Sequence, residues 1–223
     1  ILILRQTIIM LDKSSLEYRH INWGPYVLLT TLPDYITDKL LEEGYKCKQD
    51  ANFKLAGHLK FQFAYPVHVQ QWFYNEITPL LELYIEEHCK YHGLEVKKRQ
   101  LEAMDLWVNF MKTGDFNPPH THAGDYSFVY YLEVPDELKK EQEDYKGTDV
   151  AGPGAITVLY GESTRPKWTT CAHGLRPKKG AFMMFPALLQ HTVAPFKSDV
   201  TRVSVSGNLR TLNTEIFDNN NYF

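Results

Sequence analysis

From residue 105 onward the chain is a succession of short aromatic and β-branched segments, each bounded by Gly, Pro or Asp. These segments are DLWVNFMKTGD, YSFVYYLEVP, GAITVLYG, KKGAFMMFP and TRVSVSGNLR. Short strands at close spacing with turn residues between them are typical of β-sandwiches and jelly rolls. This part of the chain therefore predicts a mainly β fold, of the α+β kind, with helices packed outside the sheets.

Two stretches before residue 100 have the spacing of amphipathic helices. In LPDYITDKLLEEG, Asp34 is a candidate N-cap and Gly44 is a candidate stop. In EITPLLELYIEEHCKYHG, apolar side chains recur at helical spacing and Gly93 fits the position just after the helix. We expect both helices to pack against the strands and to take no direct part in chemistry.

The 223 residues suit one domain. We expect a single catalytic domain over residues 1–223, with a helical support region over 1–100 and a jelly-roll core over 101–212. The charged, turn-rich segment from Asp136 to Gly154 predicts a surface insertion that contains a short helix.

Charge and cysteine usage exclude several classes of protein. The formal net charge of -3 gives no sign of a nucleic-acid-binding surface. The apolar start ILILRQTIIM is too short to cross a bilayer and lacks the features of a signal peptide. Cys47, Cys89 and Cys171 are far apart and form no CxxC pair, which predicts free thiols. We therefore expect a cytoplasmic protein without a membrane or nucleic-acid partner.

Candidate metal ligands lie in the loop FNPPHTHAGD. His120 and His122 are two residues apart, and residues i and i+2 of an extended segment point to the same side. His191 lies much later, in FPALLQHTVAP, at the start of another expected strand. A close pair with one distant histidine predicts a mononuclear site, for which imidazole suits Fe, Zn, Cu or Ni. Gly124 permits a tight turn that could bring Asp125 back towards the pair.

A second constellation follows in TRVSVSGNL. Strict alternation with Val203 and Val205 puts Arg202 and Ser204 on one face of a strand, eleven residues after His191. A buried guanidinium needs an anionic partner, and a bidentate carboxylate is the best one. The alternative is an internal ion pair between Arg202 and an Asp or Glu of the chain.

The stretches HTHAGDYSFVYYLEVP, RPKKGAFMMFPALLQHTVAPF and RVSVSGN resemble the 2-oxoglutarate/Fe(II)-dependent dioxygenases of the prolyl-hydroxylase-like branch. More narrowly, they resemble the oxygenases of this type found in phages and marine bacteria. The resemblance extends from Asp105 to about Leu209. It implies a double-stranded β-helix (a cupin-like jelly roll), Fe(II), 2-oxoglutarate as co-substrate, and dioxygen. The implied activity is hydroxylation of an unknown substrate C–H, with a protein or peptide side chain as one candidate.

The resemblance also implies roles for single residues, with no catalytic group beyond the metal ligands. His120 takes the place of the first metal ligand and His191 that of the distal one. Arg202 and Ser204 take the place of the groups that hold the far carboxylate of 2-oxoglutarate. Two further positions are implied to line the co-substrate pocket: Tyr131 (or its neighbour Tyr130) and Asn109.

The chain departs from the family at the carboxylate ligand, because His122 stands where the pattern His-x-Asp/Glu has its acid. Either His122 is itself the third ligand, or Asp125 folds back and supplies the acid. We favour the first solution, because spacing of two residues on a strand needs no special turn. Asp125 would then orient a ligand imidazole through its other ring nitrogen.

Two other classes of protein compete with this interpretation. One is a jelly-roll metalloenzyme or metal-binding cupin-like protein, with Zn or Fe, that does not use 2-oxoglutarate. Such a protein has no need of Arg202 and Ser204. The other is a non-catalytic jelly-roll module, in which the three histidines need not converge.

Overall fold

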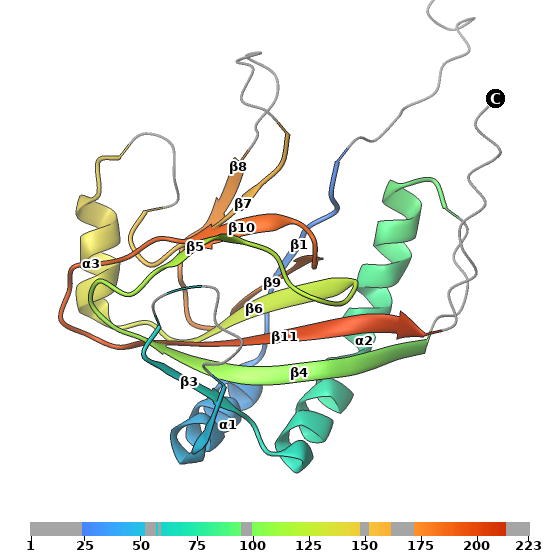
Figure 1. Ribbon diagram of the computed structural model, residues 1–223, viewed down its shortest axis with the longest axis horizontal. Helices are drawn as coiled ribbons and strands as arrows, with labels where there is room; N and C mark the ends of the chain where they lie inside the picture. The colour runs from blue at the N-terminus through green and yellow to red at the C-terminus, as the bar shows by residue number, and fades with distance from the viewer. Residues whose placement is uncertain are drawn as a thin grey trace, which may run out of the picture.

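The computed structural model describes residues 24–51, 57, 59–94, 100–147, 152–161 and 172–212. Within these residues, two antiparallel sheets face each other (Figure 1). The larger sheet has the order β1-β9-β6-β11-β4-β3-β2 and the smaller has the order β5-β10-β7-β8. The strands are β1 (Leu28–Thr31), β2 (Gln49–Asp50), β3 (Phe61–Ala64), β4 (Gln100–Met111), β5 (Asn117–His120), β6 (Tyr126–Glu133), β7 (Ile156–Leu159), β8 (Ala172–Leu175), β9 (Ala181–Pro186), β10 (Gln190–Val193) and β11 (Arg202–Leu212). The helices are α1 (Asp34–Lys46), α2 (Val67–Tyr91) and α3 (Asp136–Asp144).

Strand β11 lies at the centre of the larger sheet, between β4 and β6. The side chains of β11 alternate between the two faces of the sheet, as predicted. Val203 and Val205 join the apolar core on the helix side, whereas Arg202 and Ser204 line the cavity between the sheets. The mainly antiparallel β architecture with packed helices confirms the fold class predicted from the sequence.

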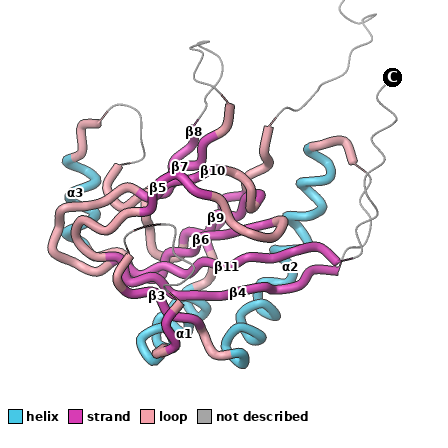
Figure 2. The backbone as a smooth tube through the Cα atoms, viewed as in Figure 1, coloured by secondary structure: helices cyan, strands magenta, loops and turns pink. Residues whose placement is uncertain are grey.

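Helices α1 and α2 cover the outer face of the larger sheet (Figure 2). Leu40 of α1 and Phe73 of α2 are fully buried there, against Phe128 and Val205 of the sheet. Tyr130 also points to this side, and its hydroxyl lies 2.5 Å from that of Thr37. The outer face is therefore structural.

The ends of α1 differ from the prediction. Its N-cap is Pro33, not Asp34, and no side chain caps the helix. Gly44 does not stop it, because the helix runs on to Lys46. A Cβ at Gly44 would lie 2.9 Å from the hydroxyl oxygen of Tyr65, so the glycine permits close packing of the helix rather than ending it.

Helix α2 begins at Val67, nine residues before the predicted stretch, and contains Pro79. Pro66 precedes it with a φ of -60°, a value that suits the entry to a helix. Gly93 follows the C-cap with a φ of +66°, so the predicted glycine terminator is confirmed. Within the described residues, no helix is both long and apolar enough to cross a membrane.

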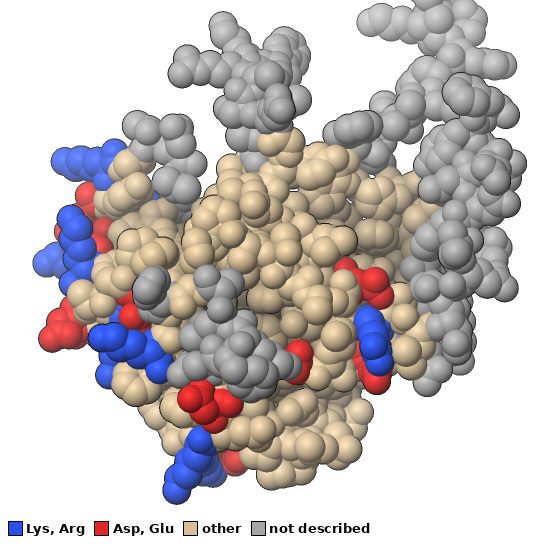
Figure 3. Space-filling model, viewed as in Figure 1, with Lys and Arg blue, Asp and Glu red and all other residues tan. Residues whose placement is uncertain are grey.

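The predicted helix of the 136–154 insertion is α3. Leu138 anchors it in the core between the sheets, and the carboxylate of Glu141 accepts hydrogen bonds from the backbone N–H groups of Lys197 and Ser198. Side chains of both charges gather over α3 on the face drawn in Figure 3. The helix therefore fastens the loop that leads into β11.

The first hundred residues contribute more than helices. Strand β1 pairs with β9 at one edge of the larger sheet, and β3 pairs with β4 near the other edge. The support region expected over residues 1–100 therefore contains strands besides its helices, and these strands extend the same sheet that holds Arg202.

Candidate functional site

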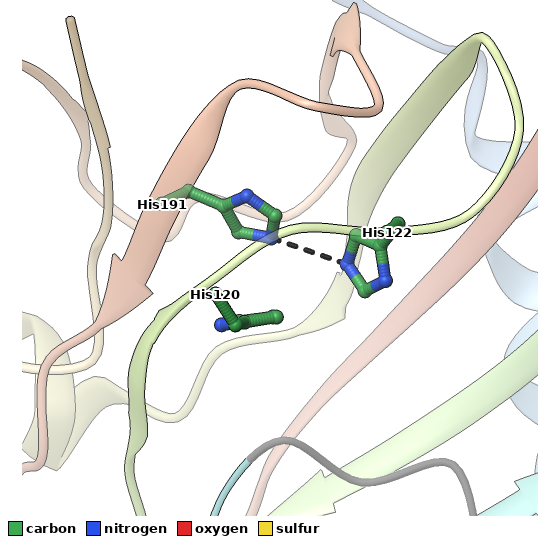
Figure 4. Close-up of side chains that lie close together, drawn as sticks. All are labelled: His120, His122 and His191. Carbon is green, nitrogen blue, oxygen red and sulfur yellow. Dashed lines mark hydrogen bonds between the residues drawn. The ribbon is translucent and has the colours of Figure 1, made fainter.

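Three histidines converge between the two sheets. His120 ends β5 and His191 lies on β10, where the two are register partners across the smaller sheet. His122 follows two residues after His120, and its Nε2 lies 3.1 Å from Nε2 of His191 (Figure 4). One ligand nitrogen from each ring can be chosen so that all three lie within 4.8 Å of one another. The structure thus brings together the residues that the sequence singled out.

Backbone carbonyls fix the rings of two of these histidines. Nδ1 of His120 lies 2.7 Å from the oxygen of Pro118, and Nδ1 of His191 lies 2.9 Å from the oxygen of Leu189. A carbonyl only accepts, so each Nδ1 carries the proton and each Nε2 keeps a free lone pair. This arrangement leaves the Nε2 atoms free to bind a metal.

Burial keeps the imidazoles uncharged. The pKa of His191 is lowered to about 3 and that of His122 to about 4. Burial is the main cause in both cases, and repulsion from the neighbouring His120 is the second. Burial likewise lowers the pKa of His120, against hydrogen bonds to the backbone that raise it. Neutral imidazole is the form that binds metals, so the cluster is ready to do so at neutral pH.

Asp125 is not part of this cluster. Its carboxylate accepts hydrogen bonds from the backbone N–H and the hydroxyl of Thr211, at 2.6 and 2.7 Å. Gly124 takes the predicted tight turn, with a φ of +93°, but the turn directs the side chain of Asp125 to the end of β11. The structure contradicts both roles considered for Asp125, as a metal ligand and as the partner of a ligand imidazole.

Arg202 lies on the floor of the cavity beside the histidines and is 3% exposed. Its Nη1 donates to the oxygen of Gly154 at 2.5 Å and its Nη2 donates to the hydroxyl of Ser204 at 3.3 Å. Its Nε has no hydrogen-bond partner. No ion pair found among the described residues includes Arg202, so the alternative of an internal pair finds no support there.

Tyr131 lies beside Arg202, on the neighbouring strand β6 of the same sheet. The guanidinium carbon lies 5.2 Å from the centre of the Tyr131 ring, and the hydroxyl of Tyr131 is buried without a partner. Burial lowers the pKa of Arg202 and Tyr131 partly offsets this, yet an arginine keeps its charge in a protein. A buried cation next to an unused phenol is therefore ready to receive an anion.

A polar row crosses four strands of the larger sheet on the cavity side. Gln62, Asn109, Ser204 and Tyr131 are successive register partners on β3, β4, β11 and β6. Asn109 is 6% exposed; its Nδ2 donates to Ser206 at 3.3 Å and its Oδ1 has no partner. The three residues of this row that the resemblance assigns to the co-substrate therefore do line the cavity. Tyr130, the alternative to Tyr131, lies on the opposite face.

Two polar residues of the cavity escaped the sequence reasoning. Gln62 and Asn117 both line it, and each has a buried carboxamide oxygen without a hydrogen-bond partner. No motif singles out either residue. The only signal is the alternation in FQFA, which reads more easily as buried phenylalanines with Gln62 outside.

The donor set fits a metal ion and a dicarboxylate. Converging neutral imidazoles are ligands that suit iron, and the three rings can each place one nitrogen within 4.8 Å of the others. A carboxylate beside Arg202 would satisfy its unpaired Nε and could also accept from the hydroxyl of Tyr131, whose oxygen lies near the backbone of Ile156.

Comparison with solved structures supports the same fold. The viral collagen prolyl hydroxylase of Paramecium bursaria Chlorella virus-1, in complex with 2-oxoglutarate, has a TM-score of 0.53 at 16% identity. That match covers 85% of this chain and 98% of the viral chain. A prolyl-4-hydroxylase of Pseudomonas putida has a TM-score of 0.51 at 16% identity, with 82% and 92% covered. HygX of Streptomyces hygroscopicus, with nickel, 2-oxoglutarate and hygromycin B bound, has a TM-score of 0.53 at 9% identity, with 85% and 83% covered.

A search of curated proteins gave no match. A family profile does match, over residues 105–208, and its description is "Putative 2OG-Fe(II) oxygenase". The matched residues include the three histidines, Arg202 and Ser204. Residues 105–208 are thus similar to the 2-oxoglutarate- and Fe(II)-dependent oxygenases, and the chain shares the fold of solved structures of this kind.

Proposed function

We propose that this chain hydroxylates a C–H bond of a protein or peptide side chain. The family match over residues 105–208 and the histidine cluster support an oxidoreductase with Fe(II) as cofactor and 2-oxoglutarate as co-substrate. One observation carries the proposal: three convergent imidazoles and an arginine with an unused Nε lie in the same buried cavity. The resemblance of the fold to prolyl hydroxylases supports the choice of substrate class.

His120, His122 and His191 would hold the iron through their Nε2 atoms. When bound, iron and 2-oxoglutarate supply the oxidation, in which dioxygen, 2-oxoglutarate and a C–H bond give succinate, carbon dioxide and a C–OH group. Burial of the imidazoles keeps them neutral, so they bind without first losing a proton. Trp107 and Phe185 pack against the rings of His122 and His191, which limits the positions that these rings can take.

Arg202 would bind the far carboxylate of 2-oxoglutarate, with Ser204 and Tyr131 beside it. The hydrogen bonds from Nη1 to Gly154 and from Nη2 to Ser204 fix the guanidinium plane and leave Nε without a partner. Asn109 is the register partner of Ser204, lines the same cavity, and has an Oδ1 without a hydrogen-bond partner. These residues orient the co-substrate and exclude water, and none of them needs to transfer a proton.

The test is an anaerobic titration of the protein with Fe(II) and then with 2-oxoglutarate, followed by visible absorption. Binding of the 2-oxo acid to iron produces a weak charge-transfer band. Iron binding without such a band would favour a jelly-roll metalloenzyme that does not use 2-oxoglutarate. Failure to bind any metal would favour a non-catalytic module.

The compartment is a further part of the proposal. Cys47 and Cys89 are free thiols, as a reducing cytoplasm would keep them. Cys171 lies outside the described residues. Location of the tagged full chain by cell fractionation would test this assignment.

A further inference from the structure

One side of the cavity carries polar groups that the proposed function leaves unused. Gln62 lies in the middle of β3 and is 4% exposed, whereas its neighbour Phe61 is 40% exposed. Burial alone would favour the reverse orientation of this strand, with the phenylalanine inside. The Oε1 atom of Gln62 is buried without a hydrogen-bond partner, and such an atom costs free energy unless a ligand satisfies it.

Asn117 reaches the same cavity from the opposite sheet. It begins β5, three residues before His120, and its Oδ1 is also buried without a partner. The chain just before β3 lies against it, since a Cβ placed on Gly57 would lie 2.2 Å from that Oδ1. Leu59 fills the space next to Gln62 and is 6% exposed. Gln62 and Asn117 therefore form one wall, built from β3 and β5.

This wall is separate from the groups assigned to 2-oxoglutarate. Gln62 is the register partner of Asn109, and Asn109 is the register partner of Ser204. One strand spacing, about 5 Å, thus separates Gln62 from Asn109, and two spacings, about 10 Å, separate it from Ser204. Arg202 lies two residues before Ser204 on β11, on the side away from the Trp107 level that contacts His122. A co-substrate held between Arg202 and the histidines would leave the wall for another ligand.

The chemistry of the cavity selects the kind of group that can bind there. The described residues that line it include no Asp, Glu or Lys, and their one permanent charge is Arg202. A cationic group would be repelled by this arginine and by a metal on three neutral imidazoles. An anionic group would meet no fixed cation at the wall. Carboxamides, each with one acceptor and one donor side, match an uncharged amide.

We propose that Gln62 and Asn117 form the subsite that hydrogen-bonds a backbone amide of a peptide substrate next to the residue that is oxidised, and that this residue is uncharged. The inference rests on the proposed function and specifies its substrate. Gln62 is thus a specificity-determining residue supplied by the first hundred residues of the chain, outside the stretch that matches the family.

The probes are capped tripeptides, acetyl-Gly-X-Gly-amide, with each of the twenty amino acids at X. Binding is measured by calorimetry on the full chain loaded with Fe(II) and 2-oxoglutarate without oxygen, so no turnover is needed. We expect at least one peptide with an uncharged X to bind. Gln62→Met keeps the shape of the side chain and should weaken that peptide about fivefold or more, since it leaves a buried amide group unpaired. The affinity for 2-oxoglutarate should not change.

Two further variants complete the experiment. Asn117→Leu should weaken the same peptide, which keeps the test valid if Gln62→Met fails to fold. Gln70→Met is the matched control, because Gln70 on α2 donates to the backbone oxygen of Tyr65 and does not line the cavity. It should bind peptide and co-substrate as the wild type does.

Three results would overturn the inference: no peptide binds to protein that has bound iron and 2-oxoglutarate, peptides with a charged X bind best, or the wall variants bind peptide normally. Loss of 2-oxoglutarate affinity in Gln62→Met would also overturn it, because the residue would then serve the co-substrate. Failure of the proposed function is seen separately, as failure of the wild type to bind 2-oxoglutarate before any peptide is added.

Discussion

His120 and His191 face each other across β5 and β10 as register partners, with ring centres 4.2 Å apart. Each ring is held by a hydrogen bond to the carbonyl two residues earlier in the chain. The sheet itself therefore sets the separation of the two imidazoles, and His122 joins them from the loop that follows β5. The positions of these two imidazoles therefore depend more on the backbone pairing of β5 with β10 than on the choice of side-chain rotamers.

Removal of single members of the cluster should separate the two ligand sets considered from the sequence. His191→Ala should abolish stable iron binding, since two imidazoles remain. Asp125→Asn should retain iron, because Asp125 contacts Thr211 and not the cluster. His122→Asp should also retain iron, because it supplies the carboxylate of the usual facial site. Iron content after anaerobic loading and desalting measures all three, and iron loss in Asp125→Asn would contradict the three-histidine assignment.

Substitution of Arg202 should affect the co-substrate and spare the metal. Arg202→Gln removes a charge-assisted hydrogen bond worth about 1.5–3 kcal/mol, so 2-oxoglutarate should bind roughly 10- to 150-fold more weakly. Iron binding should persist, because Arg202 is not part of the histidine cluster. Arg210→Gln is the control, since its guanidinium pairs with Glu102 on the surface. Iron loss with unchanged co-substrate affinity would show that the roles are misassigned.

The turn after the histidine pair should not tolerate a side chain. Gly124 has a φ of +93°, and a Cβ there would lie 2.6 Å from the backbone oxygen of Leu209. Gly124→Ala should lower the free energy of unfolding by about 1–3 kcal/mol from backbone strain, with a further cost from the contact. Gly114→Ala is matched, because Gly114 has a φ of +77° and a Cβ added there would meet no atom within 4 Å. Urea unfolding should show the larger loss for Gly124→Ala, and equal losses would exclude the contact as a cause.

Glu141 should act on the co-substrate site from a distance. Its carboxylate accepts hydrogen bonds from the backbone of Lys197 and Ser198 and from the Ser198 hydroxyl, in the loop that precedes Arg202. Glu141→Ala should lower the free energy of unfolding by about 1–3 kcal/mol and weaken 2-oxoglutarate binding. Glu137→Ala, one helical turn earlier, loses none of these side-chain bonds. Equal 2-oxoglutarate affinities in the two variants would show that the loop does not position Arg202.

The metal-free protein should lose stability as the pH falls below about 6.5. The folded-state pKa values of His191 and His122 are about 3 and about 4, below the ordinary value of 6.5. Between these values the unfolded chain binds protons that the folded protein does not, so unfolding becomes easier as acid is added. Above pH 6.5 the contribution is fully present.

The measurement for this prediction is urea unfolding of chelator-treated protein between pH 4 and pH 8. The slope of stability against pH should be shallower in His191→Gln, which removes one of the two groups. His68→Gln, at an exposed position of α2, should keep the wild-type slope. The same slope in all three proteins would mean that the buried histidines do not cause the pH dependence.

Local rules were enough to predict the histidine pair and the buried arginine, whereas the approach of His191 depends on the pairing of β10 with β5. A spacing of two residues on an extended segment forces His120 and His122 to one side, and strict alternation in β11 forces Arg202 inward. Both signals are contained within a few consecutive residues. Asp125 was harder, because the direction of its side chain depends on Thr211 at the far end of another strand.

The wall of the cavity could not be predicted in this way. Strand β3 is four residues long, and its alternation favours the face that the structure leaves outside the cavity. The apolar choice would bury Phe61 and Phe63 and expose Gln62, whereas the structure buries Gln62. Pairing with β4 decides the orientation, since it sets Gln62 opposite Asn109. The pairing of β3 with β4 is a long-range contact, so no short stretch of sequence predicts it.

The contribution of β1 and β3 to the larger sheet has a practical consequence for dissecting the protein. A fragment that begins at residue 101 would lack β1 and β3, so β9 and β4 would lose their outer neighbours in the sheet. It would also lack α1 and α2, so the hydrophobic face of the sheet would be exposed to solvent. Unpaired edge strands of this kind can form hydrogen bonds with strands of other chains, which leads to aggregation. Truncation to the stretch that carries the histidines and Arg202 should therefore yield insoluble aggregates instead of a minimal enzyme.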